Sequence, residues 1–309
     1  MIVSASRRTD LPAFYADWFF ERLRRGFCQV ANPYNPRQVS RVSLRPGDVA
    51  AFVFWSKNPA PMLDRLDLLE AGGHVYYFLY TLNDYPTLLE PGVPPVAERL
   101  TTFERLAGRL GPARVVWRYD PIVLGGPCTA DDHRRCFEQL VKRLAGATER
   151  VIVSALDFYR KTERRLAALE AERSRFVRDP WRDDTLRSLL ADLAAMAAAG
   201  GLEIAACAQA QDLRSLGIAP ARCIDPKLLA RLGRPVPQRK DRGQRPACGC
   251  APSRDIGAPD TCLHGCRYCY ATRSPELARR RHAAHRPDAP LLWPPAGRLP
   301  SGQASDQPL

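Results

Sequence analysis

The chain has 309 residues and a formal net charge of +13, and 45% of its residues are hydrophobic and 26% charged. This length and composition are ordinary for a globular protein and allow one large domain, or one domain with an appendage. No segment has the uninterrupted apolar run of a membrane-spanning helix. The N-terminus does not have the pattern of a signal peptide either, because Met1-Ile2-Val3 runs straight into Ser6-Arg7-Arg8-Thr9-Asp10. We therefore expect a cytoplasmic protein with no membrane partner.

The positive charge has two explanations, and the sequence leaves both open. A basic protein attracts polyanions, so nucleic acid is a candidate partner. Only five of the 46 basic residues are lysine, however, and such an arginine bias is typical of GC-rich genomes. The charge is also spread along the chain and not gathered in one segment.

Short apolar runs rich in β-branched and aromatic residues alternate with longer helical patterns over residues 1–215. This alternation predicts an α/β fold, with parallel strands and helices packed outside them. Six such units are too few for a closed eight-stranded barrel, and they suit a partial (β/α)6 barrel or an open doubly wound sheet. The expected strands are Met1–Ala5, Ala51–Trp55, Val75–Tyr80, Arg114–Trp117, Arg150–Ser154 and Glu203–Cys207, and the expected helices are Phe14–Arg25, Val96–Leu110, Asp131–Leu144 and Arg182–Ala199.

Polar side chains follow several of the expected strands. Arg7 and Arg8 come after the first strand, Lys57 after the second, and Arg118 with Asp120 after the fourth. In parallel α/β folds the carboxyl ends of the strands lie together at one mouth, where ligands bind. Convergence on such a mouth is one interpretation, and the usual return of polar residues after a buried strand is the other.

Regular periodicity fades after residue 215, and we place a boundary there. Residues 216–285 form a loop-rich, cysteine-rich segment that we expect to bind an iron–sulfur cluster. Residues 286–309 are rich in Pro, Gly and Ser and predict a disordered tail.

Seven of the ten cysteines lie between Cys207 and Cys269. Because the cytoplasm keeps thiols reduced, this clustering indicates metal or cluster binding and not a disulfide framework. The other three, Cys28, Cys128 and Cys136, stand alone in the sequence, and we interpret them as structural thiols.

Cys262, Cys266 and Cys269 have the spacing Cys-x3-Cys-x2-Cys. Three thiolates on one short loop can hold three irons of a 4Fe–4S cubane and leave the fourth iron without a protein ligand. The amino and carboxylate groups of S-adenosylmethionine (SAM) can chelate such an open iron. A closed zinc site is the alternative, and it would need His264 or another cysteine as a fourth ligand.

With Tyr268 directly before the third cysteine, the motif resembles the signature of the radical SAM superfamily. The resemblance implies that the cluster cleaves SAM reductively to a 5′-deoxyadenosyl radical, which abstracts hydrogen from a substrate. It also implies that Tyr268 packs beside the adenine. We expect an external electron donor of the flavodoxin or ferredoxin type.

In most of that superfamily the motif follows the first barrel strand, whereas here it follows all six expected strands. The whole arrangement resembles an uncharacterised prokaryotic family of unknown function whose C-terminal cysteines look like the radical SAM cluster loop. A circularly permuted barrel of the radical SAM type would return the loop to the same mouth. The segments that carry the resemblance are Ile2-Val3-Ser4-Ala5-Ser6-Arg7-Arg8-Thr9-Asp10, Phe54-Trp55-Ser56-Lys57-Asn58-Pro59, Trp117-Arg118-Tyr119-Asp120-Pro121-Ile122 and Cys269-Tyr270-Ala271.

Two pieces also resemble spore photoproduct lyase and related DNA-repair enzymes. These are Arg118-Tyr119-Asp120-Pro121-Ile122 and the Tyr268-Cys269-Tyr270-Ala271 end of the cluster loop. This resemblance implies a damaged nucleic acid base as the substrate, which agrees with the positive charge.

The remaining cysteines of the C-terminal half are Cys207, Cys223, Cys248 and Cys250. Four is the number of thiolates that fully ligates a second 4Fe–4S cluster or one zinc ion. An auxiliary cluster is therefore one interpretation. In the other, Cys207 is buried as a small apolar residue and Cys223 is an incidental thiol.

Four basic side chains near strand ends are candidate ligands for SAM. Arg7 and Arg8 can clamp its carboxylate or a substrate phosphate, and Lys57 and Arg118 can contact SAM or substrate. The alternatives are a solvated loop for the two N-terminal arginines, a surface position for Lys57, and a structural ion pair between Arg118 and Asp120.

The sequence thus predicts a radical SAM enzyme, with nucleic acid as the first candidate substrate and a peptide or small metabolite as the second. Two other functions stay open. One is an iron–sulfur electron-transfer or regulatory protein that does not cleave SAM. The other is a zinc-stabilised nucleic-acid-binding module without catalysis.

Overall fold

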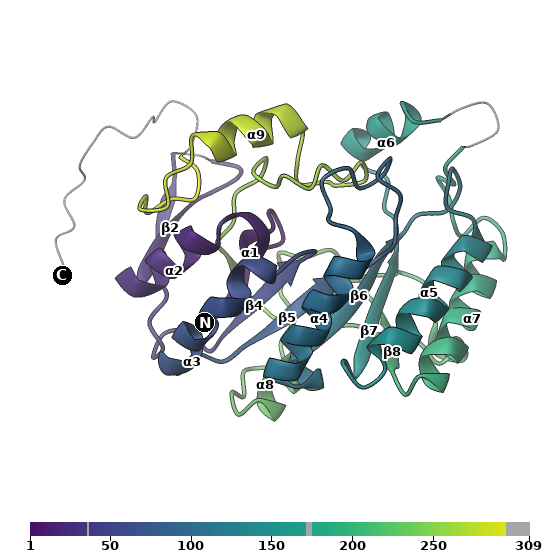
Figure 1. Cartoon of the computed structure of the whole chain (residues 1–309), viewed down its shortest axis with the longest axis horizontal. Coiled ribbons are helices and arrows are strands. Elements are labelled where there is room, and N and C mark those ends of the chain that lie inside the picture. The colour runs from purple at the N-terminus through teal and green to yellow at the C-terminus, as the bar shows by residue number, and fades with distance from the viewer. Residues whose placement is uncertain (36, 171–174, 295–309) are drawn as a thin grey trace.

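The structure, a computed structural model, describes residues 1–35, 37–170 and 175–294. Its centre is an eight-stranded sheet in which every pair of neighbouring strands is parallel (Figure 1). The six expected strands lie side by side in chain order. From one edge of the sheet to the other the strands are β10 (Arg254–Asp255), β1 (Ile2–Ala5), β4 (Ala51–Ser56), β5 (Tyr76–Thr81), β6 (Val115–Ile122), β7 (Arg150–Ala155), β8 (Glu203–Ala206) and β9 (Ala219–Pro220).

This strand order confirms the α/β fold. Strand β1 and strands β4 to β9 follow one another across the sheet in chain order, and β10, the last strand of the described chain, pairs with β1 at the other edge. No closed barrel is present among the described residues, because the edge strands β10 and β9 each pair with only one neighbour.

Four amphipathic helices cover one face of the sheet (Figure 1). Their apolar side chains pack against the aromatic side chains of the strands. The ring centres of Phe103 and Tyr80 lie 4.9 Å apart, and those of Phe137 and Trp117, which are stacked, also lie 4.9 Å apart. Burial of this aromatic layer provides the main driving force for the fold. The four helices are α2 (Ala16–Arg25), α4 (Val96–Leu110), α5 (Ala130–Leu144) and α7 (Thr185–Ala199).

The opposite face of the sheet is covered by residues 221–251 and not by a second layer of long helices. Ile224 and Leu229 pack against strand residues of this face, and the hydroxyl of Tyr77 donates a hydrogen bond to the carbonyl of Cys223 at 2.6 Å. Because both faces are covered, β4 and β5 are buried along their whole length. The cysteine-rich segment therefore shares a core with the sheet.

Short elements complete the described chain. An antiparallel hairpin of β2 (Phe27–Ala31) and β3 (Val39–Ser43) forms a separate sheet that the sequence did not indicate. The short α-helices are α1 (Leu11–Phe14), α3 (Asp67–Ala71), α6 (Arg160–Ala167), α8 (Pro226–Arg231) and α9 (Pro275–Ala283), and the 3-10 turns are η1 (Ala60–Arg65), η2 (Pro112–Arg114) and η3 (Arg214–Leu216). No helix of the described residues is long and apolar enough to span a membrane.

The structure differs from the expected boundaries by more than one residue in three places. The helix expected at Phe14–Arg25 is divided at Tyr15 into α1 and α2. The helix expected to begin at Arg182 begins at Thr185. Strand β6 continues beyond Trp117 to Ile122, because the chain keeps pairing with β7 across a register shift. Arg118 and Asp120 therefore lie within a strand and not after it.

The expected disordered tail is described only in its first part. There Trp18 donates to the carbonyl of Ala289 at 2.8 Å, Gln29 donates to that of Pro290 at 2.8 Å, and Leu292 is buried. These contacts fix the segment against α2 and β2. The rest of the expected tail, residues 295–309, lies outside the described residues.

Candidate active site at the strand ends

A cavity of about 450 Å³ lies at the carboxyl ends of the strands. Its wall combines residues from the ends of β1, β4, β5, β6, β7 and β8 with residues of the C-terminal loop that carries the Cys-x3-Cys-x2-Cys motif, residues 261–271, which we call the cluster loop. The expected convergence of strand ends and cluster loop on one mouth is therefore confirmed. All predicted site residues line this one cavity: Arg7, Arg8, Lys57, Arg118, Cys207, Cys223, Cys248, Cys250, Cys262, Cys266, Tyr268 and Cys269.

The cluster loop is held at this mouth by hydrogen bonds from distant parts of the chain. The hydroxyl of Tyr15 donates to the carbonyl of Thr261 at 2.7 Å, and the backbone N–H of Gly92 donates to the carbonyl of His264 at 2.9 Å. Gly92 must be a glycine for this approach, because a Cβ atom there would lie 2.6 Å from the carbonyl oxygen of Leu263. The loop is thus positioned by close backbone packing.

His264 uses both of its ring nitrogens to attach the loop. Its Nε2 lies 2.8 Å from Oδ2 of Asp10, and its Nδ1 lies 3.1 Å from the carbonyl oxygen of Gly92. Asp10 also accepts hydrogen bonds from the Ser56 hydroxyl and from the Lys57 backbone N–H, both at 2.7 Å. In this arrangement His264 has no free nitrogen with which to complete a zinc site.

Two of the three thiols of the cluster loop, those of Cys262 and Cys266, lie in an environment that disfavours the free thiolate. Burial raises the pKa of Cys262 to about 12, and burial also raises the pKa of Cys266 well above its ordinary value. A bound cation reverses this balance, because metal ligation stabilises the thiolate. Within residues 1–35, 37–170 and 175–294 no fourth Cys, His, Asp or Glu side chain completes a metal site with these three sulfurs. Three thiolates from one short loop suit a cubane with one open iron, whereas a closed zinc site needs four ligands.

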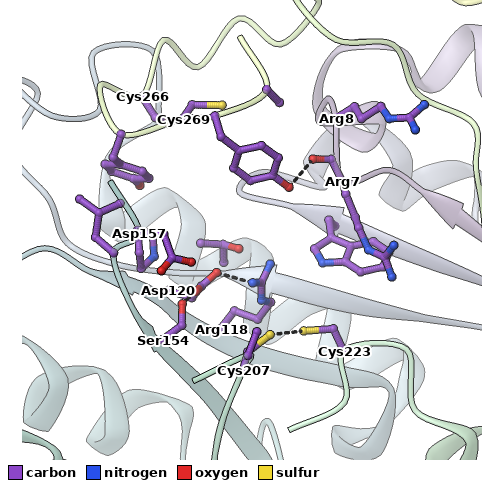
Figure 2. Close-up of a pocket in the computed structure, with 18 of the residues that line it drawn as sticks. Arg7, Arg8, Arg118, Asp120, Ser154, Asp157, Cys207, Cys223, Cys266 and Cys269 are labelled. Carbon is purple, nitrogen blue, oxygen red and sulfur yellow. Dashed lines mark hydrogen bonds and ion pairs between the residues drawn. The ribbon is translucent and has the colours of Figure 1, made fainter. Parts of the chain in front are cut away.

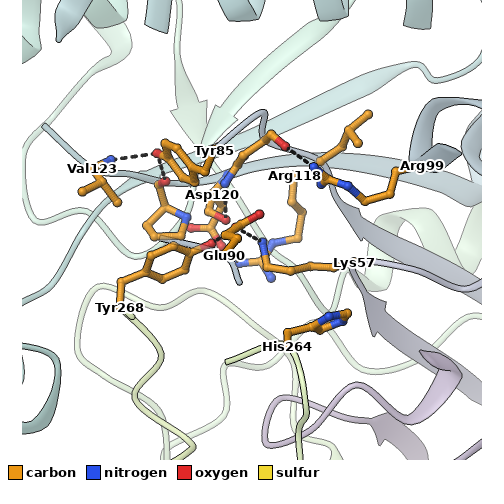
Figure 3. A network of polar contacts seen from close by, with 12 residues as sticks. Lys57, Tyr85, Glu90, Arg99, Arg118, Asp120, Val123, His264 and Tyr268 are labelled. Atoms are coloured by element: carbon orange, nitrogen blue, oxygen red, sulfur yellow. Dashed lines mark hydrogen bonds and ion pairs between the residues drawn. The ribbon is translucent and has the colours of Figure 1, made fainter. Parts of the chain in front are cut away.

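A buried network connects the cluster loop to the loop before α4 (Figure 3). Nζ of Lys57 lies 2.8 Å from Oε1 of Glu90, which also accepts a hydrogen bond from the hydroxyl of Tyr268. Burial favours a raised pKa for Glu90, but the charges of Lys57 and Arg99 hold its pKa below the ordinary value. Only 13% of the Lys57 side chain is exposed, so the surface position considered for Lys57 is wrong.

Glu90 was not identified from the sequence, because it lies in an irregular segment with no motif around it. Its side chain is 1% exposed, and its Oε2 atom is buried without a hydrogen-bond partner. A buried carboxylate oxygen of this kind requires a donor. The only sequence signal for it would have been an acidic residue isolated among apolar ones.

Arg118 and Asp120 form the ion pair that the sequence left open (Figure 2). Asp120 also accepts a hydrogen bond from the hydroxyl of Ser154. Burial alone would lower the pKa of Arg118, but the negative charge of Asp120 raises it above the ordinary value. The Nε atom of Arg118 is buried without a partner, so this N–H can still donate a hydrogen bond to a ligand.

Arg7 also presents an unsatisfied donor to the cavity. Its guanidinium lies 5.2 Å from the centre of the Trp55 ring, and its Nη2 atom is buried without a hydrogen-bond partner. Its backbone is fixed by a hydrogen bond from its N–H to Asp255 at 2.8 Å and by one from the Tyr270 hydroxyl to its carbonyl at 3.1 Å. Arg8 lines the same wall.

Cys207, Cys223, Cys248 and Cys250, which we call the second cysteine group, form a row of neighbouring sulfurs. Sγ of Cys207 lies 3.4 Å from Sγ of Cys223, which hydrogen-bonds to Cys250, which in turn hydrogen-bonds to Cys248. These hydrogen bonds lower the pKa of Cys207 and Cys250 and raise the pKa of Cys223 and Cys248. In Figure 2, Arg118 and Asp120 lie between Cys207 and Cys223 below and Cys266 and Cys269 above.

All ten cysteines are free thiols, and in the described chain no three or more Cys, His, Asp and Glu side chains are gathered tightly around one point. Both groups of cysteines line the cavity. The three isolated cysteines are outside this cavity: Cys28 is fully buried in the core under the helices, and Cys128 and Cys136 line a separate cavity beside α5.

The fold and the site together define an α/β protein whose parallel strand ends and cysteine-bearing loop enclose one basic cavity. The chain belongs to the family described as "domain of unknown function (DUF1848)", whose family model matches residues 2–271. The match ends at the last residue of the cluster loop and includes every predicted site residue. This confirms the expected family of unknown function.

No curated protein and no solved structure matches the chain. The resemblances to radical SAM enzymes and to spore photoproduct lyase therefore stay predictions.

Proposed function

We propose that the protein is a radical SAM enzyme whose 4Fe–4S cluster is held by Cys262, Cys266 and Cys269. When bound, such a cluster with one open iron supplies reductive cleavage of SAM and the hydrogen abstraction that follows. The observation that carries the proposal is that these three cysteines line the same cavity as the carboxyl ends of six parallel strands.

The sheet order supports a circularly permuted partial barrel. Strand β10 leads into the cluster loop, and it pairs in parallel with β1 at the edge of the sheet. Asp255 of β10 accepts hydrogen bonds from Ser6 at 2.8 Å and from the Arg7 backbone N–H at 2.8 Å. In space the cluster loop therefore follows a strand that precedes β1, which is the order expected if the first strand and its loop had moved to the C-terminal end of the chain.

The side chains around the loop have separate roles in this proposal. His264, through Asp10 and Gly92, holds the loop and fixes the direction of its thiols. Arg7, with its unpartnered Nη2 atom, binds the carboxylate of SAM or an anionic group of the substrate. Tyr268 lines the cavity, and its hydroxyl bonded to Glu90 fixes its ring for contact with the adenine.

Nucleic acid is the first substrate class that we propose, and a peptide or small metabolite is the second. Two tyrosines at the cavity wall, Tyr159 and Tyr270, are 43% and 54% exposed, and their ring centres lie 5.9 Å apart. Arg8 and Arg245 line the same wall. Exposed aromatic rings beside basic side chains are typical of surfaces that stack unpaired bases.

The proposal requires an external electron donor of the flavodoxin or ferredoxin type, since reductive cleavage of SAM consumes an electron that must be resupplied to the cluster. The two alternative functions are an iron–sulfur electron-transfer or regulatory protein that does not cleave SAM and a zinc-stabilised nucleic-acid-binding module. The engagement of both His264 nitrogens argues against a zinc site completed by that residue.

The test is an assay for 5′-deoxyadenosine in anaerobically purified protein that has been reduced with dithionite and mixed with SAM. We expect product from the wild type and from Cys136→Ala, and no product from Cys266→Ala. Iron without product would favour the electron-transfer protein. Colourless protein that contains zinc and binds nucleic acid in a salt-sensitive way would favour the binding module.

A further inference from the structure

A second site is formed by the second cysteine group, outside the Cys-x3-Cys-x2-Cys motif. Its four residues come from three different segments, at the end of β8, before α8 and in the loop at 248–250. The row of sulfurs runs from Cys207 through Cys223 and Cys250 to Cys248, and its first two members are 3.4 Å apart. Isolated structural thiols have no reason to meet in this way, as Cys28 illustrates by its burial among apolar side chains.

Each of the four cysteines is fixed by a backbone hydrogen bond. Cys207 N–H donates to Val153 at 2.8 Å, and Cys248 N–H donates to Arg245 at 2.9 Å. The carbonyl of Cys223 accepts from the Tyr77 hydroxyl at 2.6 Å, and that of Cys250 accepts from Asp241 N–H at 2.9 Å. Hydrogen bonds to the rest of the fold therefore hold the backbone at all four positions, and rotation of the side chains directs the sulfurs.

The surroundings suit negatively charged sulfur. The backbone N–H of Ile224 donates to Sγ of Cys250 at 3.4 Å. The positive charge of Arg118 interacts with Cys207 and Cys223, and that of Arg7 interacts with Cys250. Two guanidinium groups and a backbone donor compensate part of the charge that four thiolates would carry.

We propose that Cys207, Cys223, Cys248 and Cys250 bind a second metal group through four thiolates. Four thiolates without water or carboxylate ligands select soft metals, which here means a 4Fe–4S cluster or a zinc ion. The four cysteines line the same cavity as the cluster loop, so the bound group faces the space between the two cysteine groups. The site is independent of the proposed radical chemistry, since it shares no ligand with the cluster loop.

Metal analysis of a chain that lacks the first site tests the proposal. The triple variant Cys262→Ala/Cys266→Ala/Cys269→Ala, purified anaerobically, should retain about four irons with sulfide, or about one zinc, per chain. Adding Cys248→Ser and Cys250→Ser to it should reduce both metals to near zero. Because the cluster-loop cysteines are absent from both chains, failure of the proposed function does not affect this result.

A second measurement covers the case in which the triple variant does not fold. In an otherwise unchanged chain, Cys248→Ser/Cys250→Ser should lower the metal content by one group, while the matched control Cys136→Ser should keep it. The proposal is overturned if the folded triple variant has no metal, if Cys248→Ser/Cys250→Ser leaves the metal content unchanged, or if freshly isolated protein carries a Cys207–Cys223 disulfide.

Discussion

His264 in the cluster loop and Asp10 near the N-terminus are joined through Nε2 and Oδ2 at 2.8 Å, although 254 positions separate them in the sequence. Both side chains are buried, with 3% and 6% of their surfaces exposed. The pair connects the last part of the chain to the end of the first strand, and it sets where the three cluster-loop thiols lie.

The Asp10–His264 pair gives the first prediction. Asp10→Asn keeps the shape of the side chain but replaces the carboxylate that accepts hydrogen bonds from the Ser56 hydroxyl and the Lys57 backbone N–H and that faces His264, and a hydrogen bond to a charged group contributes about 1.5–3 kcal/mol. We therefore expect Asp10→Asn to lower the free energy of unfolding by about 1.5–3 kcal/mol and to lower the iron content. Asp64→Asn is the matched control, because that carboxylate is 91% exposed and its loss should change stability by less than about 0.5 kcal/mol. Equal stability of the two variants would contradict this role for Asp10.

Two glycines, Gly92 and Gly108, give the second prediction, as a matched pair of alanine variants. Gly92→Ala places a Cβ atom 2.6 Å from the carbonyl oxygen of Leu263, so the cluster loop must shift away from the cavity mouth. Gly108 lies in α4 with open space around it, and Gly108→Ala should stabilise that helix by about 0.5–1 kcal/mol. We expect the temperature of thermal unfolding and the iron content to be lower in Gly92→Ala than in the wild type, and neither to be lower in Gly108→Ala. Tolerance of alanine at Gly92 would show that the loop is not closely packed there.

The buried ion pair between Lys57 and Glu90 gives a third prediction. Lys57→Met leaves the Glu90 carboxylate buried without its cation and should destabilise the protein by about 3–5 kcal/mol. The double variant Lys57→Met/Glu90→Gln should regain part of this loss, because no charge is then left unpaired. For comparison, Lys142→Met breaks the exposed pair with Glu138 and should have little effect. Chemical denaturation measures all three, and a double variant as unstable as Lys57→Met would contradict the pairing.

His133 should make stability depend on pH. Its Nε2 bonds to the carbonyl of Val123 at 2.9 Å and its Nδ1 to the hydroxyl of Tyr119 at 2.7 Å, and burial lowers the pKa of the ring. The unfolded chain therefore takes up a proton near pH 6.5 before the folded chain does, so this contribution is complete above about pH 6.5 and is lost below it.

The matched variant for this effect is His133→Gln, which cannot titrate. The pKa of Asp132 is lowered by its hydrogen bonds to Thr129, and burial raises that of Cys136, so neither neighbour changes its charge in this range. We expect the difference in unfolding free energy between wild type and variant to shrink as the pH falls from 7.5 to about 5.5. A constant difference would show that His133 is not held neutral.

The sequence was most informative where one local pattern determines the outcome. The six strands followed from short apolar runs between helical segments, and the cluster loop followed from the spacing of Cys262, Cys266 and Cys269. The polar Arg118 predicts a strand end that is too early, because its side chain lines the cavity from within β6 while the backbone keeps pairing with β7. A single polar residue in a strand does not show whether pairing continues beyond it.

Contacts between distant segments were the part that the sequence did not determine. Nothing near Glu90 indicates that it meets Lys57 and Tyr268, and nothing near Gly92 indicates that a loop at the other end of the chain packs against it. The row of sulfurs from Cys207 to Cys250 likewise depends on how residues 221–251 cover the sheet. These relationships arise only from packing, because the residues involved share no sequence motif.

Electron paramagnetic resonance of the reduced, anaerobic protein with and without SAM tests the central claim most directly. To observe one cluster only, the chain should carry Cys248→Ser and Cys250→Ser, and Cys266→Ala should be compared in the same background. We predict the signal of a reduced 4Fe–4S cluster that changes when SAM is added and that is absent in Cys266→Ala. A signal that SAM leaves unchanged, or protein that holds zinc in place of iron, would contradict an open iron site at the strand ends.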